Sequence, residues 1–232
     1  MLDLFGKTIF DYQTQTNSEN IFTETNISEL DEMDISYMFR SFDAMPPIEQ
    51  KALRLCKGKI LDVGCGAGSH SLYLQNQAKL DVTAIDISEK SIETCKLRGV
   101  KKAKVQHLLD VEEKFDTILL LMNGTGIFRK LTEISAYLQK LKSIINTNGQ
   151  ILIDSSDIIY MFDEEADGSR WIPADGYYGE LDFTIHYQGE KESFPWLYLD
   201  YNTLQNACFA NGLQCKLLYE GNHFDYLAQL FI

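Results

Sequence analysis

The run from Ile60 to Ser69, ILDVGCGAGS, constrains the fold of this chain more than any other stretch. Its first half is typical of a buried strand, and glycines occupy positions 64, 66 and 68 of its second half. Glycine lets the backbone take a positive φ and leaves no Cβ where a ligand comes close. A helix that follows such a turn presents free N–H groups to whatever lies on it. Asp62 near the strand end predicts a polar cavity there, because a charge is rarely buried without a polar partner.

Beyond this run, strand patterns alternate with helix patterns. The segment at 115–122 is an almost unbroken apolar run, which is typical of a central parallel strand covered on both faces. Such alternation implies right-handed crossovers and a doubly wound α/β sheet. We expect strands at 59–64, 80–86, 103–107, 115–122 and 150–154, and helices opening at Pro46-Pro47 and spanning 69–77, 89–98 and 131–145.

The two ends of the chain have a different character. Residues 11–36 are polar, and we expect a loop or weak helix there, whereas 35–42 carry enough apolar residues to pack on the main domain. Residues 158–179 are expected to form an irregular loop of a length that is usually functional or disordered. The remaining elements are expected to be a hairpin at 181–187 and 194–199, a helix at 201–210, and two antiparallel strands at 213–219 and 226–232.

The run at 60–69 resembles the first motif of the class I S-adenosylmethionine (SAM)-dependent methyltransferases, and the resemblance extends from about residue 50 to the end. It implies a Rossmann-like, mostly parallel seven-stranded sheet with helices on both faces and an antiparallel last strand. We therefore divide the chain into an N-terminal helical lid at 1–46 and a SAM-binding domain at 47–232. Residues 158–200 would be an inserted loop and β-hairpin on the substrate side of that domain.

The resemblance also implies which residues of the turn contact the cofactor. A nicotinamide dinucleotide site is the competing functional interpretation, but it needs the spacing G-x-G-x-x-G, and this chain has G-x-G-x-G. A plain strand-to-helix turn is the alternative without function. Asp62 would bind the amino group of the methionine part of SAM, and the close contacts would come from Gly64, Cys65, Gly66, Ala67 and Gly68.

Asp86 ends the second expected strand, at a distance from Gly68 that agrees with a strand–helix–strand unit. A carboxylate there can accept hydrogen bonds from both ribose hydroxyls, and Ile87 beside it would lie against the adenine face. The alternative role for Asp86 is to cap the next helix, but Ser88 followed by Glu89 is the better candidate for that.

Two further cofactor contacts are less specific. Similar enzymes often carry an acidic residue just after the third strand, where this chain has His107 and, slightly further on, Asp110. Either side chain, or neither, would reach the edge of adenine. Asn123 follows the fourth strand, at the lip that touches cofactor and substrate in similar enzymes.

A catalytic base does not stand out. His223, His186 and Tyr37 are weak candidates, because a single histidine is more often structural or simply exposed. For His70, packing or capping is the expected role. Arg40 would either hold a carboxylate of the cofactor or substrate, or pair with an acidic neighbour.

Two kinds of chemistry are disfavoured. Asp154 and Asp157 would be the carboxylates nearest to a metal site, but capping is their commoner role, so we expect no metal. The segment after the fourth strand has neither the Asn/Asp-Pro-Pro-Tyr run of adenine and cytosine amino methyltransferases nor the Pro-Cys pair of cytosine-C5 enzymes.

The charge distribution points the same way. The net charge is −13, with 10 acidic and 2 basic side chains in residues 1–50 alone. Such a surface repels nucleic acid, whose binding rests on neutralising phosphates. The acidic ends either serve solubility alone or favour a neutral or cationic acceptor.

The expected compartment is the cytoplasm. The chain has five cysteines and no C-x-x-C pair, which is typical of reduced thiols. No apolar run approaches the roughly 20 residues of a membrane span, and the first residues lack the layout of a signal peptide. We therefore expect neither a membrane partner nor a disulfide framework.

These observations predict an enzyme that moves a methyl group from SAM to an O, N or C nucleophile of a small molecule by in-line displacement, leaving S-adenosyl-L-homocysteine (SAH). The alternatives are a SAM-binding module without turnover and a protein methyltransferase whose acidic rim attracts a basic target. The identity of the acceptor, and whether the protein is a monomer or a homodimer, stay open at this point.

Overall fold

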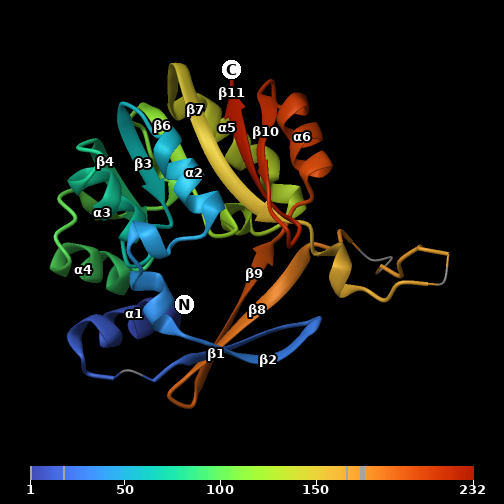
Figure 1. The fold of residues 1–232 in the computed structure, drawn as a ribbon, viewed down its shortest axis with the longest axis horizontal. Helices are drawn as coiled ribbons and strands as arrows, with labels where there is room; N and C mark the ends of the chain where they lie inside the picture. The colour runs from blue at the N-terminus through green and yellow to red at the C-terminus, as the bar shows by residue number, and fades with distance from the viewer. Residues whose placement is uncertain (1, 18, 166, 173–175) are drawn as a thin grey trace.

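The computed structural model describes residues 2–17, 19–165, 167–172 and 176–232. Its main body is a seven-stranded sheet, and a separate four-stranded sheet lies across the carboxyl ends of the parallel strands (Figure 1). The large sheet has the order β10-β11-β7-β6-β3-β4-β5. Its strands are β3 (Lys59–Val63), β4 (Asp81–Asp86), β5 (Ala103–Val105), β6 (Phe115–Leu120), β7 (Ile145–Ser156), β10 (Gln214–Glu220) and β11 (Asp225–Phe231).

The strand directions confirm the predicted sheet. Parallel pairing joins β3 to β4 and to β6, β4 to β5, and β6 to β7. The last strand, β11, is antiparallel to both of its neighbours, β7 and β10. A mostly parallel sheet with an antiparallel last strand results.

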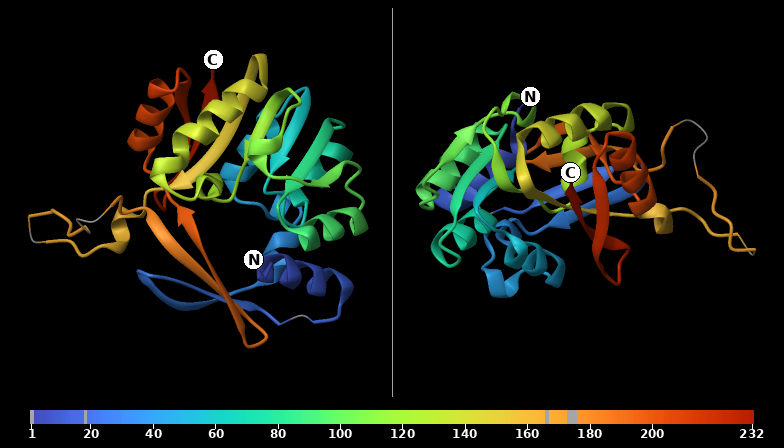
Figure 2. Two further views of the ribbon diagram at one scale, coloured as in Figure 1. Left: turned by 180° about the vertical axis from the view of Figure 1, so that it is seen from behind. Right: turned by 90° about the horizontal axis from the view of Figure 1, so that it is seen from above.

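Helices cover both faces of this sheet, as expected (Figure 2). On β6, Ile118 and Leu120 face the layer of α5 (Ile134–Ile144) and α6 (Tyr201–Ala210), whereas Leu119 faces α2 (Pro47–Leu55) and α3 (Ser69–Asn76). Because both faces are buried, the strand reads as a continuous apolar run. Near the other edge, α4 (Glu89–Leu97) packs Ile92 and Cys95 on β4. Short 3₁₀ helices cover other connections: η1 (Ile35–Phe39), η2 (Phe42–Ala44), η3 (Leu108–Asp110), η4 (Gly124–Phe128), η5 (Leu131–Glu133) and η6 (Ile158–Met161).

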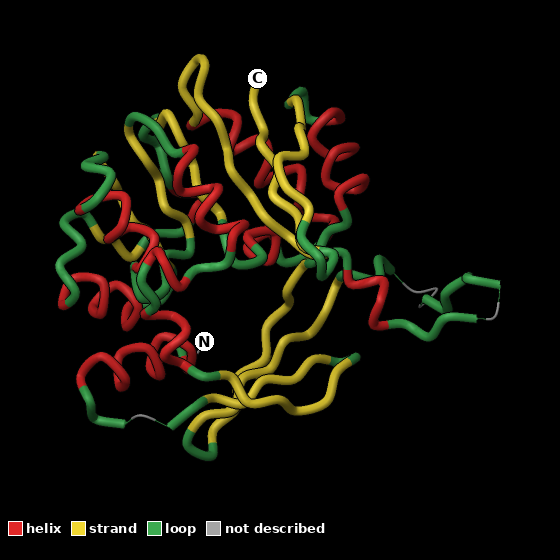
Figure 3. Tube along the Cα trace, viewed as in Figure 1, coloured by secondary structure: helices red, strands yellow, loops and turns green. Residues whose placement is uncertain are grey.

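The N-terminal segment is only partly helical, so the expectation of loop or weak helix over 11–36 was wrong for most of that stretch. α1 (Leu4–Thr14) is followed by a hairpin of β1 (Ile21–Thr25) and β2 (Ser28–Met33), drawn in yellow at the bottom of Figure 3. Ile21 pairs with Met33 and both face inward, while the other side of the hairpin faces solvent. Only one face needs apolar residues, so the strands look polar in sequence.

The inserted hairpin was predicted correctly and completes the second sheet. β8 (Glu180–Tyr187) and β9 (Glu190–Leu197) are paired, and β8 also pairs with β1, giving the order β2-β1-β8-β9. The segments 162–165 and 167–172 project from the body (Figure 1). Of the loop expected at 158–179, residues 166 and 173–175 lie outside the described residues.

One boundary differs inside the large sheet. The strand expected at 150–154 begins at Ile145, directly after α5. Asn148 has a φ of +67°, and the pairing of β6 with β7 shifts register across this stretch. Asn148-Gly149 is therefore an irregularity within a strand and not the end of a helix.

Candidate functional site

A cavity of about 360 Å³ lies between the carboxyl ends of β3 and β6 and the inner face of the second sheet. Its volume is within the range of small-molecule sites. The glycine turn after β3 and the lip after β6 form one wall. Phe5 of α1, Met33 of β2 and the aromatic side chains of β8 and β9 form the opposite wall.

The glycine turn has the backbone that its sequence predicted. Gly64, Gly66 and Gly68 have φ values of +69°, +51° and +79°. A Cβ on Gly68 would come within 2.9 Å of Cys95 Sγ, so this glycine allows close packing of α4. A Cβ on Gly66 would meet only Ile9 Cδ1, at 3.9 Å, so the space beside it is open. Gly64, Cys65, Gly66 and Ala67 all line the cavity.

Asp62 lies in the same wall, at the end of β3. Its side chain is 2% exposed, and its Oδ2 accepts a hydrogen bond of 2.6 Å from Ser71 Oγ. Burial raises the pKa of this carboxyl group. Within the described part of the chain, its remaining lone pairs are free to meet a donor in the cavity.

A buried ionic network continues from Asp62. Glu49 on α2 accepts from His70 Nε2 at 2.6 Å and is paired with Arg40 Nη2. Burial would raise the pKa of Glu49, but its contacts with His70 and Arg40 outweigh burial and lower that pKa. Burial would lower the pKa of His70, but the hydrogen bond to Glu49 outweighs burial and raises it. Arg40 and His70 line the cavity. Sequence reasoning missed Glu49, because its partners are far away along the chain.

Asp86 lies directly behind the glycine turn. Its two oxygens accept hydrogen bonds from Gly66 N (3.0 Å) and Ser88 N (2.9 Å). Ser88 Oγ accepts from Ser91 N, so Ser88 is the cap of α4, as the sequence indicated. Asp86 and the exposed Ile87 lie beside the cavity and not in its lining, because the start of α1 packs over this turn.

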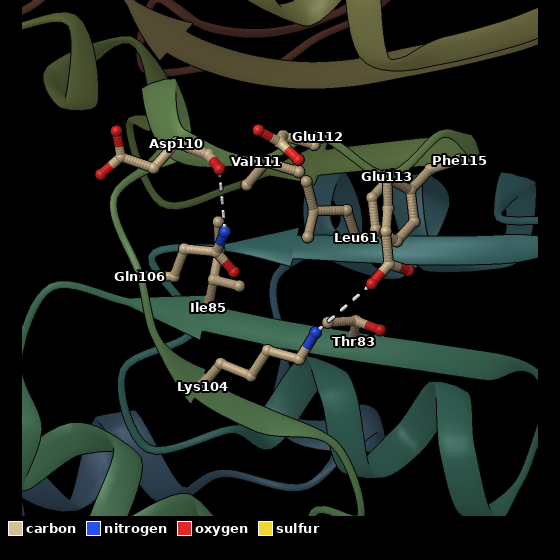
Figure 4. A pocket seen from close by; sticks show the side chains of 10 residues that line it. All are labelled: Leu61, Thr83, Ile85, Lys104, Gln106, Asp110, Val111, Glu112, Glu113 and Phe115. Atoms are coloured by element: carbon tan, nitrogen blue, oxygen red, sulfur yellow. Dashed lines mark hydrogen bonds and ion pairs between the residues drawn. The ribbon is translucent and has the colours of Figure 1, made fainter.

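His107 and Asp110 also lie outside that lining. His107 Nδ1 accepts from Leu109 N and caps η3. Asp110 borders a second cavity, of about 200 Å³, under the segment that joins β5 to β6. Figure 4 shows its carboxylate pointing away from this cavity while its backbone oxygen accepts from Gln106. The structure therefore does not distinguish His107 from Asp110 as the residue that contacts adenine.

The lip after β6 is strained and firmly held. Met122 and Asn123 have φ values of +67° and +59°, in a region that non-glycine residues rarely adopt. Asp154 on β7 accepts hydrogen bonds from Met122 N (3.0 Å) and Gly124 N (2.9 Å). Burial raises the pKa of Asp154 to about 7. Met122, Asn123 and Gly124 line the cavity, as expected of a lip after this strand.

The three candidate bases are placed away from the cavity lining. His186 is on the outer face of β8, where it pairs with Glu24, because alternate residues of a strand point to opposite faces. His223 is exposed in the turn before β11. Tyr37 is partly exposed and stacks under Arg40, whose guanidinium carbon is 3.7 Å from the ring centroid.

An aromatic cluster forms most of the opposite wall. The ring centroids of Phe183, Phe194 and Trp196 are 5.7–6.3 Å apart. Tyr198, which directly follows β9, completes it. The signal for this wall was present in the hairpin sequence as aromatic residues two positions apart, which share a face.

Carboxylates elsewhere have structural roles. Asp157 caps η6 through Ile159 N and accepts from the Tyr178 hydroxyl. Across the described ranges, no three His, Cys, Asp or Glu side chains are grouped so as to hold a metal ion. None of the described helices is both long and apolar enough to cross a bilayer.

Comparison with known proteins identifies the family. Residues 60–149 match a family model described as a methyltransferase domain. The chain is 40% identical to a SAM-dependent methyltransferase from Bacteroides fragilis, crystallised in complex with SAH. The match covers 99% of this chain and 94% of that one, with a TM-score of 0.92. No curated protein matches the chain.

More distant structures share the fold alone. DesVI from Streptomyces venezuelae is 15% identical over 84% of this chain and 91% of its own, with a TM-score of 0.56. CalS10, an amino pentose methyltransferase from Micromonospora echinaspora, is 14% identical over 82% and 91%, with the same TM-score.

The chain therefore belongs to the SAM-dependent methyltransferases, and it is an enzyme whose methyl donor is SAM. The wall around Asp62 fits that cofactor in two respects. The glycine turn leaves a cradle that a Cβ at position 66 would begin to fill. Arg40 Nε is buried without a hydrogen-bond partner among the described residues, which suits it to receive an anionic group.

Proposed function

We propose that this enzyme methylates an O, N or C nucleophile of a small molecule held in the 360 Å³ cavity. The observation that carries the proposal is the position of the cavity: α1 and the second sheet lie over the glycine turn and the lip after β6. A protein side chain reaching the same point would need an open groove. A site of this size and depth suits a molecule of modest dimensions.

We assign the contacts to SAM as follows. Asp62 would accept from the amino group of the methionine part, and Arg40 Nε would donate to its carboxylate. Asp86 would accept from the ribose hydroxyls once α1 makes room beside Ser88. Ile87 would pack on adenine, whose edge would meet His107 or Asp110.

Bound SAM supplies a methyl group already activated by its sulfonium: the acceptor lone pair forms the new bond to carbon, the carbon–sulfur electrons go to sulfur, and any proton displaced from the acceptor leaves to water. The chain itself contributes alignment and exclusion of water. Asn123 and Met122 are held rigidly at the lip, and the second sheet covers them. A base is needed only when the nucleophile starts out protonated.

We further propose that α1 acts as part of the lid over the glycine turn. Glu192 on β9 accepts from the backbone N–H groups of Leu2 (2.7 Å) and Leu4 (2.9 Å) and so caps the helix. Gly6 packs so closely on Ser88 that a Cβ there would lie 2.0 Å from its Oγ. Deleting residues 2–16 should therefore reduce turnover more than stability, because β1 and β2 stay in their sheet. An equal loss of turnover and stability would show that α1 is part of the structural core and not a lid.

The test separates an enzyme from a binding module. Calorimetry should show SAM and SAH binding in the cavity, with loss of affinity in Asp62→Asn. A panel of small-molecule acceptors should then yield SAH in stoichiometric amounts with methylated product. Retention of SAM without SAH release from any acceptor would favour a non-catalytic module, and release only with basic peptides would favour a protein methyltransferase.

A further inference from the structure

The two walls of the cavity differ in chemistry. The side chains of the lining that can carry a charge at neutral pH, Arg40, Asp62 and His70, all belong to the wall beside the glycine turn, and Glu49 links two of them. No charged side chain from β8 or β9 lines the cavity in the described part of the chain. Charge recognition is therefore confined to the side proposed above for the amino-acid end of SAM.

Glu192 does not break this pattern. It lies on the inner face of β9, but its carboxylate is occupied by the backbone N–H groups at the start of α1. Besides the indole N–H of Trp196, the remaining polar group of this wall is the hydroxyl of Tyr198. Burial raises the pKa of its phenol to about 12, so it stays neutral and offers a hydrogen bond but no charge.

The aromatic wall is also fixed in place, and the planes of its three rings are inclined to one another by 31–66°. A Cβ on Gly126 would lie 2.0, 2.3 and 2.4 Å from three bonded atoms of the Trp196 ring, so the face of the indole rests on the glycine backbone. Phe194 and Phe183 contact the ring from the side, with centroids 6.0 and 6.3 Å away. A platform whose indole is backed by the Gly126 backbone and braced at its side by two phenyl rings loses little entropy when it receives a ligand.

A ligand lying on this platform must tolerate the loss of water from its face. Each hydroxyl left without a partner costs about 1–3 kcal/mol on burial, so a polyhydroxylated ring is disfavoured there. A flat aromatic ring loses no hydrogen bonds and gains stacking worth about 0.5–1.5 kcal/mol per ring pair beyond its burial.

The lip supplies a single neutral donor opposite the platform. Asn123 Oδ1 accepts from Ser156 Oγ at 3.1 Å, which leaves the Asn123 amide N–H groups without a partner among the described residues. They suit one oxygen or nitrogen atom at the rim of a ring.

Building on the proposed function, we propose that the methyl acceptor is a flat, mainly apolar aromatic or heteroaromatic molecule with one nucleophilic O or N, which packs against the wall formed by Phe183, Phe194 and Trp196. The aromatic wall selects the ring, and Asn123 orients its polar atom. The acceptor is recognised by shape and by hydrogen bonds from neutral groups, and an anionic group on the ring would find no partner on this wall.

Matched probes test this directly on the full-length protein saturated with SAH. We expect calorimetry to show 2-naphthol binding at least tenfold more tightly than decahydro-2-naphthol, which has the same skeleton and hydroxyl group but is not flat. Glucosamine, as a polar ring, should bind no better than the saturated probe. Equal affinities for the flat and saturated probes, or preference for the sugar, would overturn the proposal.

Paired variants locate the effect. Trp196→Leu should weaken 2-naphthol binding at least tenfold while SAH affinity changes less than twofold. Trp171→Leu is the control, because that indole is 75% exposed on the projecting segment, and it should change neither. Phe194→Leu, a smaller change, guards against misfolding of the first variant. Unchanged 2-naphthol affinity in both platform variants would refute this inference alone, whereas failure of the wild type to bind SAH would refute the proposed function itself.

Discussion

Asp154 provides the sharpest test of how the lip after β6 is held. Its carboxylate oxygens accept from Met122 N and Gly124 N, the residues on either side of Asn123. Left-handed backbone costs about 1–2 kcal/mol per residue with a side chain, and Met122 and Asn123 both adopt it. The carboxyl group of Asp154 therefore stabilises a turn that would otherwise relax, and replacing it with an amide perturbs that turn with little change of volume.

The magnitude follows from its burial. Asp154 is 6% exposed, and burial raises its pKa from 3.8 to about 7. Because the folded-state pKa lies above the unfolded value, its contribution to stability is fully present below about pH 4 and is lost as the pH rises through about 7. At about 1.4 kcal/mol per tenfold change in proton affinity, the loss totals about 4 kcal/mol, of which about 3 kcal/mol falls between pH 5 and pH 8.

Asp154→Asn is neutral at every pH and has one acceptor oxygen where the wild type has two. At about pH 5 the variant should be less stable than the wild type by about 1–3 kcal/mol, because one of the two backbone N–H groups, that of Met122 or that of Gly124, loses its hydrogen-bond acceptor. The difference in free energy of unfolding between wild type and variant should then move by about 3 kcal/mol in favour of the variant by about pH 8.

Urea unfolding of both proteins across this pH range measures the effect. Asp116→Asn is the matched control: the pKa of Asp116 is lowered by the backbone N–H of Lys59 and the amide of Asn146, so it is ionised in both states over the whole range. The change in free energy of unfolding caused by Asp116→Asn should therefore not vary with pH. If the difference in free energy of unfolding between wild type and Asp154→Asn were also independent of pH, the reasoning would be refuted.

Three other substitutions test the site. Asp86→Asn should weaken SAM binding about 10- to 100-fold in calorimetry, the value of a hydrogen bond to a charged group, and unchanged affinity would remove Asp86 from the ribose site. Glu49→Gln should lower the free energy of unfolding by about 3–5 kcal/mol, because it strands Arg40. The pKa of His70 is raised from 6.5 by its bond to Glu49. The wild type therefore loses the stability from this pair as the pH rises through that raised value. A pH-independent difference in free energy of unfolding between wild type and Glu49→Gln would contradict this. Glu192→Gln should speed hydrogen exchange at the start of α1 without melting the sheets; unaltered exchange would show that the cap is dispensable.

Local patterns were enough to predict the large sheet. The strand-and-helix alternation from 59 to 154 depends on residues that are close in sequence, and the fully buried β6 carries its apolar run openly. The hairpin of β1 and β2 was not predictable in this way. Its strands owe their structure to pairing with β8, which lies in the last quarter of the chain, and many of their side chains face solvent.

The site divides along the same line. The glycine turn, Asp62 and Asp86 fall within one strand–helix–strand unit, so local patterns placed them at one edge of the sheet, and the family resemblance implied their roles. The Glu49 network and the aromatic wall are assembled from several elements; pairing of Arg40 with an acidic neighbour was one of its two expected roles, but the sequence did not identify Glu49 as that neighbour. His186 shows the converse: its position in the right hairpin was foreseen, but strand parity sends it to the outer face.

The order of the strands in the second sheet has a consequence for how the enzyme is made on the ribosome. β1 and β2 emerge first, but the partner that holds them, β8, starts at residue 180, and the carboxylate that fastens the amino terminus, Glu192, comes later still. Nascent chains must therefore carry the hairpin of β1 and β2 without its neighbour until β8 has been translated. Chains truncated before β9 would lack Glu192 and also α6, β10 and β11, so the roof and that side of the α/β core are completed together.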